Sequence, residues 1–238
     1  SRLTAERLTL IQSSNTLRFE GPTQLLRWTQ RRQPDVEPDT DIRASNGRWN
    51  LETGDLGVRG PVRALRRKDL TVTASALQGN TQQGFLDLIQ PVRLEQQDGA
   101  INAGTTRWNL AEQRLRSIAP FQGKRQDATA MGNGFVIDEA ATTVIIPKAC
   151  QLTQPGESLK AHRCSWNWAT NRVVADGDVV LRRQDPDQET RAPRMEGQLG
   201  SSEGVRFGST GQRVQSSIRF RPDQPHSRPP SSRPRVSF

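Results

Sequence analysis

The residue types that most often carry catalysis or bind metal ions are scarce in this chain. Its 238 residues include two histidines, His162 and His226, and two cysteines, Cys150 and Cys164. No CxxC motif is present, so a zinc site has almost no ligands to draw on. The carboxylates are scattered through turn-like segments, chiefly at Asp55, Asp98, Asp127, Glu139 and Asp176. Because so few histidines allow no nucleophile–histidine–acid set, the sequence predicts a protein that is not an enzyme and needs no cofactor or metal.

The two cysteines are compatible with a disulfide and also with two inert thiols. The segment "QPGE" (154–157) between them is a turn signal. A hairpin closed at this turn would place Cys150 opposite Ala161 instead of Cys164. Because a disulfide requires a specific separation of the two Cα atoms, this register argues against a bond.

Arginine has the clearest chemical meaning among the charged residues. Lysine and arginine together number 34, of which four are lysine and 30 are arginine, and the formal net charge is +9. Arginine binds phosphate and carboxylate groups in a bidentate manner. The charge therefore favours an anionic partner, which could be a nucleic acid, a membrane surface or a phosphorylated lipid. A general excess of arginine that only maintains solubility would give the same composition.

An internal repeat organises these residues. The pattern apolar-x-Ala ends at Ala5, Ala44, Ala74, Ala103, Ala130 and Ala161. Five residues after each alanine stand Leu10, Trp49, Gly79, Trp108, Phe135 and Trp166, of which all but the glycine are large and apolar. Seventeen residues after each alanine stand Pro22, Pro61, Pro91, Pro120, Pro147 and Asp178. Agreement at three linked offsets predicts about six units of roughly 29 residues each.

Each unit is expected to form about two β-strands. "LTVTASA" (70–76) alternates apolar or small residues with Thr and Ser, and "LDLIQPVRL" (86–94) places its leucines and Val92 on one face. This period of two is typical of strands with one buried face. No segment competes as a helix, and no apolar run is long enough to span a membrane. Stacking the units would create one continuous apolar interior.

The repeat also defines the predicted domain organisation. One β domain is expected over residues 1–220, with an insertion at about 30–41 that lengthens the first step of the repeat. Residues 221–238 are rich in Pro, Arg and Ser and cannot bury much surface. A disordered tail is therefore predicted there.

The repeat resembles that of a known family. "TAERLTLIQSSNTLRFEGPTQL" (4–25), "ASNGRWNLETGDLGVRGPVRA" (44–64) and "LDLIQPVRLEQQDGAINAGTTRWNL" (86–110) are similar to the repeats of the periplasmic lipopolysaccharide-transport proteins of the LptC, LptA and OstA type. The resemblance covers about residues 3–181 and is most like an extended LptC. It implies an elongated, twisted, open β-jellyroll of two facing antiparallel sheets.

The resemblance also implies a function and a set of partners. Family members bind lipopolysaccharide in a hydrophobic groove, receive it from an inner-membrane ABC transporter complex, and pass it towards the outer membrane. They pair edge to edge with other β-jellyroll proteins of the same pathway. A periplasmic location is expected, with anchoring to the inner membrane by an N-terminal helix that precedes Ser1.

Carried onto this sequence, the resemblance nominates two groups of residues. The side chains expected to line the groove are Trp49, Leu51, Val72, Leu86, Leu88, Val92, Ile101, Trp108, Leu110, Phe121, Phe135, Ile146 and Trp166. In "RALRRK" (63–68), Arg63, Arg66 and Arg67 are expected to meet anionic head groups. The same tryptophans would also suit a plain hydrophobic core, and "RALRRK" would also suit a solvated hairpin edge.

Two other functions fit parts of the sequence. A parallel β-helix enzyme or adhesin can also carry repeats of twenty to thirty residues, although such enzymes need clustered carboxylates. A nucleic-acid-binding protein would account for the basic charge. Single-strand binders, however, expose aromatic side chains among basic ones, whereas the aromatics here fall at repeat positions that should point inward. No nucleic-acid partner is therefore expected.

Overall fold

The computed structural model describes residues 2–28, 36–66, 69–184, 187–198, 205–208 and 214–219. Within these ranges the chain forms β-strands and one short 3₁₀ turn, η1 (Gln12–Ser14). Every strand pairing is antiparallel. The predicted all-β, antiparallel class is therefore confirmed. The alternative of a parallel β-helix is wrong, because neighbouring strands run in opposite directions.

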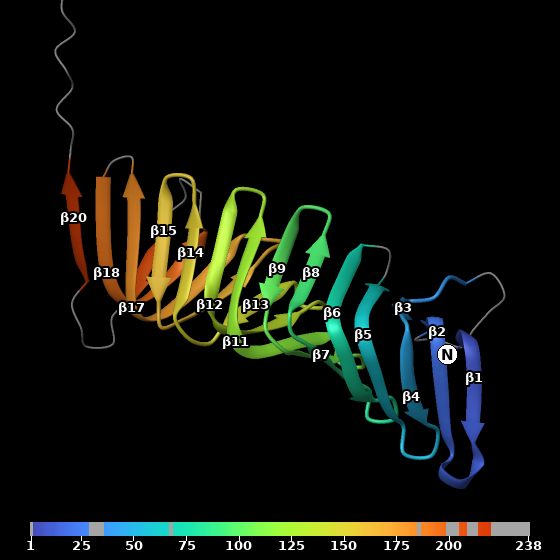
Figure 1. Ribbon diagram of the computed structural model, residues 1–238. Coiled ribbons are helices and arrows are strands. Elements are labelled where there is room, and N and C mark those ends of the chain that lie inside the picture. The colour runs from blue at the N-terminus through green and yellow to red at the C-terminus, as the bar shows by residue number, and fades with distance from the viewer. Residues whose placement is uncertain are drawn as a thin grey trace, which may run out of the picture.

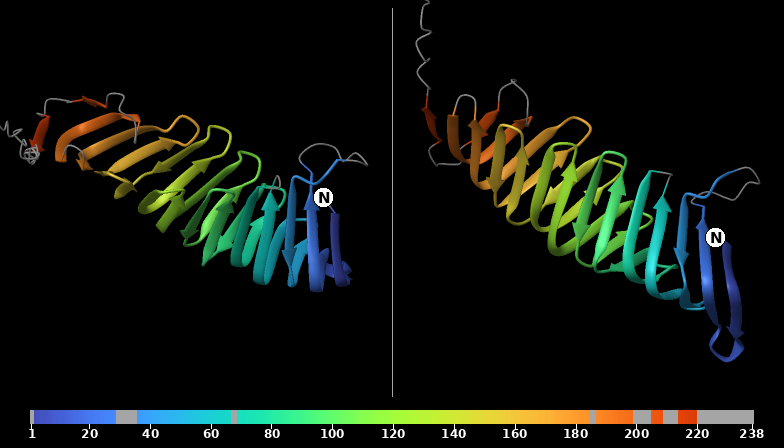
Figure 2. Two further views of the ribbon diagram at one scale, coloured as in Figure 1. Left: turned by 90° about the horizontal axis from the view of Figure 1, so that it is seen from above. Right: turned by 45° about the horizontal axis from the view of Figure 1, so that its top comes forward.

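Strands lie side by side in chain order, so the molecule is elongated, with β1 at one end and β17 to β20 at the other (Figure 1). The strands are β1 (Arg2–Ile11), β2 (Thr16–Arg27), β3 (Thr40–Ala44), β4 (Asn46–Asn50), β5 (Asp55–Arg66), β6 (Leu70–Asn80), β7 (Phe85–Ile89), β8 (Val92–Gln96), β9 (Gly99–Ala103), β10 (Thr106–Asn109), β11 (Arg114–Arg125), β12 (Ala128–Asp138), β13 (Thr143–Ile146), β14 (Cys150–Gln154), β15 (Glu157–Ala161), β16 (Arg163–Asn167), β17 (Arg172–Gln184), β18 (Asp187–Gln198), β19 (Arg206–Gly208) and β20 (Gln215–Arg219). Figure 2 shows that the stack twists along its length.

The chain crosses the molecule repeatedly, and each crossing bends in its middle. Some crossings are a single long strand, such as β5 or β11, and others are two short strands in succession, such as β7 and β8. The bends align into one crease that divides the sheet into two facing halves. The lower half-sheet contains β4, β7, β10, β13 and β16, and the upper half-sheet contains β3, β8, β9, β14 and β15; the long strands run through both.

Irregular backbone forms the crease. The pairing register shifts there in β1 with β2, β5 with β6, β11 with β12, and β17 with β18. Gly60 has a φ of 90° at this point in β5, which a glycine adopts without steric cost. Pro61 and Pro120 lie within the irregular segments, and Pro91 immediately precedes β8. Proline lacks an N–H group and is tolerated at such bulges, so the repeated proline marks the crease.

Four rows of side chains point into the space between the half-sheets, two on each side of the crease. The Trp108 row, in the lower half-sheet, contains Leu10, Leu17, Trp49, Leu56, Gly79, Leu86, Trp108, Leu115, Ile137, Val144, Trp166, Val173 and Gly197. Beside it, nearer the crease, the Phe135 row includes Leu77, Leu88, Thr106, Ser117, Phe135, Ile146, Cys164, Ala175 and Met195.

The upper half-sheet contributes the other two rows. Next to the crease, the Ala103 row contains Ala5, Thr23, Ala44, Val62, Ala74, Val92, Ala103, Phe121, Gly132, Cys150, Ala161, Val179 and Ala192. Further out, the Ile101 row includes Ile42, Ala64, Val72, Leu94, Ile101, Gly123, Ala130, Leu152, Leu159 and Leu181. The core is one continuous cluster of these residues.

The rows correct two positions of the predicted repeat. Ala130 belongs to the Ile101 row, and Gly132 takes the place in the Ala103 row that the other repeat alanines occupy. Phe135 pairs with Ser117, whereas Trp108 pairs with Leu115, so the phenylalanine lies one row closer to the crease than the tryptophans. Both corrections have one cause. In β12 the apolar-x-Ala phrase ends two residues before the position that the repeat alanine occupies in the other units.

Parts of the predicted domain organisation lie outside the described residues. This applies to the tail at 221–238 and to residues 30–35 of the insertion. The remainder of the insertion leads into β3, which already begins at Thr40. The indole N–H of Trp28 donates a hydrogen bond of 2.8 Å to the carbonyl oxygen of Val36 and so joins the two sides of the segment.

Glycine substitutions test the inner rows. A Cβ atom at Gly79 would lie 2.4 Å from the carbonyl oxygen of Phe85, whereas one at the outward-facing Gly57, on the neighbouring strand, would meet nothing closer than 3.9 Å. We expect Gly79→Ala to lower the free energy of unfolding by about 1–3 kcal/mol. Gly57→Ala should leave it unchanged or raise it slightly. Denaturant unfolding followed by circular dichroism measures both, and equal effects would contradict the assignment of the rows.

Candidate functional site

Most of the predicted groove residues point into the interior between the half-sheets. Those that are buried are Val72, Leu86, Leu88, Val92, Trp108, Phe121, Phe135 and Ile146. Trp49, Ile101, Leu110 and Trp166 are partly buried and pack against the same core. Leu51 lies in the turn after β4 and is 47% exposed, so it is the one member of the group outside the interior.

Turns close the free edge of the lower half-sheet, and side-chain hydrogen bonds hold most of them. Asn109 Oδ1 accepts hydrogen bonds from the N–H groups of Ala111 and Glu112. Asn50, Asn80 and Asn167 make the same pair of bonds in the equivalent turns. The sequence carries a signal for these residues that was not among the predictions above, since each asparagine directly follows a member of the Trp108 row. They fix the turns that follow the Trp108 row.

Two acidic residues at strand ends beside the turns of this edge have depressed pKa values. The Thr53 hydroxyl and the Asn80 amide, which hydrogen-bond to the carboxylate, lower the pKa of Asp55. The pKa of Asp138 is lowered mainly by a hydrogen bond from the Ala141 N–H and then by one from Arg114. Both groups stay ionised at neutral pH and serve as structural acceptors.

The interior has a mouth, by which we mean the line opposite the crease where the free edges of the two half-sheets approach each other. On the lower side it is bordered by the turns 110–113, 139–142 and 168–171, and on the upper side by the ends of β5, β11 and β14. Two arginines from the upper side, Arg66 and Arg125, reach contacts on the lower side. The mouth is therefore closed by polar contacts over an apolar interior.

Arg66 makes the more buried of these contacts. It ends β5, and its Nη1 lies 3.2 Å from Glu139 Oε1, with the two side chains 7% and 18% exposed. The guanidinium carbon is 5.2 Å from the centre of the Trp108 ring, which is within the range of a cation–π interaction. The Trp108 Nε1 group is buried and finds no hydrogen-bond acceptor among the described residues. An unsatisfied buried donor of this kind costs about 1–3 kcal/mol.

Arg125 crosses the mouth further along the stack. Its Nε donates to Asp98 Oδ2 at 2.8 Å, and its Nη1 donates to the carbonyl oxygen of Trp168 at 3.0 Å. Asp98 lies in the turn between β8 and β9, on the same side as Arg125, whereas Trp168 lies in the turn after β16. The carboxylate thus orients the guanidinium towards the opposite edge. Neither Arg125 nor Trp168 was predicted from the sequence, because their contact joins segments 43 residues apart.

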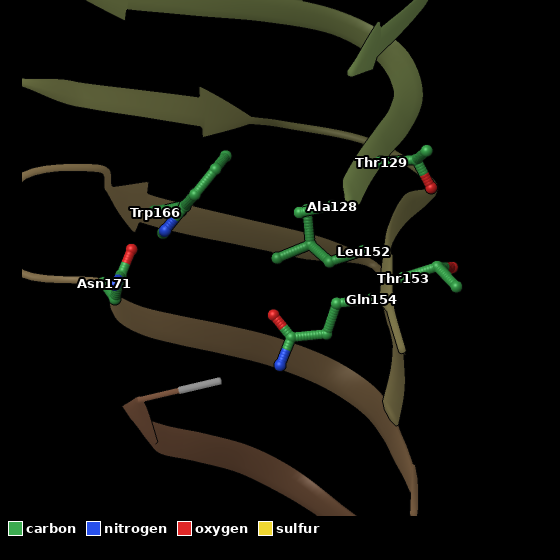
Figure 3. Close-up of a pocket in the computed structure, with 7 residues that line it drawn as sticks. All are labelled: Ala128, Thr129, Leu152, Thr153, Gln154, Trp166 and Asn171. Carbon is green, nitrogen blue, oxygen red and sulfur yellow. The ribbon is translucent and has the colours of Figure 1, made fainter. Parts of the chain in front are cut away.

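A small hollow lies between the two edges near Trp166 (Figure 3). Trp166 and Asn171 border it from the lower side. Residues of β12 and β14 border it from the upper side, namely Ala128, Thr129, Leu152, Thr153 and Gln154. Its volume of about 30 Å³ has room for about two water molecules and is far too small for an acyl chain. In this conformation the interior is therefore packed with the protein's own side chains at this point.

The three arginines predicted to meet head groups do not form one patch. Arg66 points inward at the mouth, whereas Arg63 is exposed on the outer face of β5, where it pairs with Arg43 of β3. The alternation of the strand separates them, because residues 63 and 66 differ by an odd number of positions. Arg67 lies outside the described residues. Only Arg66 of the described pair borders the predicted groove.

Cys150 and Cys164 form a disulfide, which contradicts the argument from the hairpin register. The predicted register itself is confirmed, since Cys150 pairs with Ala161. The argument failed because β15 ends at Ala161 and the chain then crosses the crease into β16. Cys150 belongs to the Ala103 row and Cys164 to the Phe135 row, and these rows meet in the crease. The bond joins β14 to β16, two strands that do not pair with each other.

The end of the stack at β1 is open. Among the described strands β1 pairs with β2 alone, so its other edge offers unpaired backbone groups. Leu8 and Leu10 lie on this last strand, and they are 46% and 52% exposed because no further described strand covers them. Ile11 is exposed beside them. An unpaired strand edge with exposed apolar side chains is suited to pairing with another β-sheet.

The chain was compared with protein-family models, curated proteins and solved structures. No protein-family model matches the chain, and no curated protein does. Among solved structures, the chain is similar to LptH from Pseudomonas aeruginosa, described as the LptA-homologous periplasmic component of the lipopolysaccharide transport device. The two are 12% identical, the match covers 64% of this chain and 95% of LptH, and the TM-score is 0.41.

The described residues contain no helix that is both long and apolar enough to cross a membrane. The same residues contain no group of three or more His, Cys, Asp or Glu side chains that could hold a metal ion.

Removal of the disulfide should destabilise the fold without changing its architecture. The bond closes a loop with a sequence separation of 14 residues, for which the loss of chain entropy in the unfolded state predicts about 3 kcal/mol of stabilisation. The double substitution Cys150→Ala with Cys164→Ala should lower the unfolding midpoint in urea accordingly. A reducing agent added to the unfolded wild-type protein should have the same effect, and no effect on the double variant. A midpoint that is unchanged in both experiments would contradict a structural role for the bond.

Proposed function

We propose that this protein is a non-catalytic carrier and bridge for lipopolysaccharide. In this proposal it accepts the lipid from an inner-membrane ABC transporter complex and passes it through its interior towards the outer membrane. The observation that carries the proposal is an unbroken apolar interior that runs along the stack and is closed on one side by polar contacts. On that side the edges of the two half-sheets are joined by contacts such as Arg66–Glu139 and Arg125–Trp168, and the described strands do not pair there.

Acyl chains suit the chemistry of the interior. Burial of a methylene group in apolar surroundings stabilises a complex by about 0.8 kcal/mol, so chains of about a dozen carbons would gain much from entering the four inner rows. Because the interior is packed when the mouth is closed, entry requires the half-sheets to separate at the mouth. Trp49, Ile101, Leu110 and Trp166 are the partly buried residues of the predicted set, and Trp166 borders the small hollow at that opening.

The ends of the stack support the proposed bridging role. The free edge of β1 would add another β-jellyroll of the pathway as a neighbouring sheet, and the exposed Leu8 and Leu10 would continue the apolar interior across the junction. At the opposite end, β20 pairs with β18 alone among the described strands and so presents a second edge. Continuity of the inner rows across such a junction would let lipid pass from one protein to the next.

The disulfide supports a location outside the cytoplasm. Disulfides persist in oxidising compartments such as the bacterial periplasm and are rare in reducing ones. We therefore propose a periplasmic location. By its resemblance to LptC-type members, we further propose that a helix upstream of Ser1 anchors it to the inner membrane.

Photo-crosslinking tests lipid carriage. We expect a benzophenone amino acid in place of Ile101 to crosslink to purified lipopolysaccharide, because the side chain points into the interior beside the mouth. The same substitution at Asn102, the next residue of β9, provides a matched control on the outer face and should give little product. Equal crosslinking from both positions would indicate surface adsorption, and absence of any product would contradict the proposal.

Charge substitution at the open end tests edge pairing. We expect wild-type protein to associate end to end at high concentration in sedimentation velocity experiments. Leu10→Glu would place a charge on the exposed apolar end and weaken association at least about tenfold. Thr9→Glu introduces the same charge on the outer face, opposite Arg18, and should leave association intact. A wild-type protein that stays monomeric would contradict pairing with a second copy through this edge.

A further inference from the structure

The contact between Arg66 and Glu139 differs from the other ion pairs of the described residues. Most pairs join side chains of the same strand or of neighbouring strands on the outer surface, as in five examples whose arginine side chains are 47–76% exposed. Arg66 and Glu139 are 73 residues apart and belong to opposite edges of the mouth. β5 pairs with β3, β4 and β6, and none of these pairings extends to β12 or to the turn that follows it. The two residues meet only because the mouth is closed.

Arg66 and Trp108 lie against each other at this point. The guanidinium of Arg66 lies over the Trp108 ring, and the indole Nε1 of Trp108 is fully buried without an acceptor among the described residues. Glu139 supplies an oxyanion to the guanidinium. A phosphate or carboxylate group offers several acceptor oxygens and can engage a guanidinium in a bidentate manner. The carboxylate of Glu139 therefore occupies the position in which the anionic group of a ligand would be stabilised by Arg66.

The site also has an apolar neighbour. Trp108 belongs to the inner row that contains Leu86 and Leu115, both fully buried. Any separation of Arg66 from the opposite edge uncovers this part of the interior. A ligand that combines an oxyanion with an acyl chain could thus contact the guanidinium and the uncovered row at the same time, which neither a free anion nor a neutral lipid can do.

We propose that the Arg66–Glu139 pair is a latch on the mouth, and that the phosphate of an anionic lipid opens it by replacing Glu139 at Arg66. Glu139 acts as an internal stand-in for the ligand's phosphate and keeps the interior over Trp108 closed while no lipid is present. A population of closed molecules lowers the apparent affinity for every acyl ligand, because opening must precede binding. The proposal rests on the proposed function, in which the interior accepts acyl chains.

The test uses dodecyl phosphate as the anionic probe, dodecyl maltoside as the neutral probe and inorganic phosphate as the free anion, each titrated by calorimetry below micelle formation. Wild-type protein should prefer dodecyl phosphate to dodecyl maltoside. Glu139→Gln removes the competing charge at nearly constant shape and should tighten binding of dodecyl phosphate by about tenfold. Glu112→Gln is the matched control, because Glu112 lies in the neighbouring turn of the same edge but forms an exposed pair with Arg114. It should leave the affinity unchanged.

Arg66 variants separate the latch from a purely structural ion pair. Arg66→Lys keeps the positive charge but cannot bind an oxyanion in a bidentate manner, so the preference for dodecyl phosphate should shrink while dodecyl maltoside still binds. Circular dichroism of each variant at the working temperature identifies any that fail to fold. Hydrogen exchange of the turn 139–142 gives a second readout, and it should accelerate when wild-type protein binds dodecyl phosphate.

The outcomes distinguish this proposal from the one on which it rests. If Glu139→Gln binds dodecyl phosphate no more tightly than wild type, while lipopolysaccharide still crosslinks to the interior, the latch is refuted and lipid carriage stands. If neither acyl probe nor lipopolysaccharide binds to wild type or to Glu139→Gln, lipid carriage itself fails. If inorganic phosphate binds as tightly as dodecyl phosphate, the site takes a free anion, and its coupling to the interior is refuted.

Discussion

The fold depends on how the chain crosses the crease without turning its apolar side chains outward. Where the chain passes from the upper to the lower half-sheet, the inward residues on either side of the crease are three positions apart, as are Ala103 and Thr106. Where the chain passes back from the lower to the upper half-sheet, the corresponding residues are four positions apart, as are Ser117 and Phe121. The extra residue accommodates proline, glycine or a register shift on alternate crossings. Because the two step lengths alternate, every crossing keeps one face inward, and the four inner rows remain continuous along the stack.

The crease also sets which side chains fit at its centre. In the Ala103 row, small residues on one set of crossings alternate with larger ones on the next, so neighbouring strands share the limited space. Phe121 and Phe135 meet there edge to face, with ring centres 5.1 Å apart. Cys150 and Cys164 each lie 29 positions further along the chain than one of these phenylalanines, which places them at the same two locations one unit later. A covalent bond thus replaces an aromatic contact at an equivalent point, which explains why two cysteines on unpaired strands can be joined.

The alternation of inward apolar and outward polar side chains on each side of the crease was predictable from the sequence. So were the antiparallel all-β class and the inward direction of Trp49, Trp108 and Trp166. These features are local, because a period of two and a turn signal are visible within about ten residues. The break in this period at the crease was not predictable. Ala103 and Thr106 are three positions apart, so a regular strand would direct them to opposite faces, and nothing in "INAGTTRWNL" shows that both face inward. For the same reason the predicted repeat assigned Ala130 to the position that Gly132 occupies. The argument against the disulfide likewise overlooked that the chain crosses the crease between Ala161 and Cys164.

Contacts between residues far apart in the sequence could not be predicted from the sequence. Arg66 was singled out for its charge, but its place beside Trp108 and Glu139 depends on which crossing faces which across the interior, a consequence of the twist of the whole stack. Arg63 was grouped with Arg66 because they are close in sequence, although the strand directs them to opposite faces. The open end at β1 carried a visible apolar signal in Leu8 and Leu10, whose exposure reflects only the absence of a further strand beside β1 among those described.

The contacts across the mouth have a consequence for how the molecule unfolds. In a stack of strands, each crossing touches mainly its neighbours, and such arrays tend to fray from their ends in small steps. The Arg66–Glu139 contact joins β5 to the turn after β12, and the Arg125–Trp168 contact joins β11 to the turn after β16. If a strand between two joined segments unfolds, the contact that spans it is also weakened. The central part of the protein should therefore melt as a single cooperative unit, flanked by ends that open earlier.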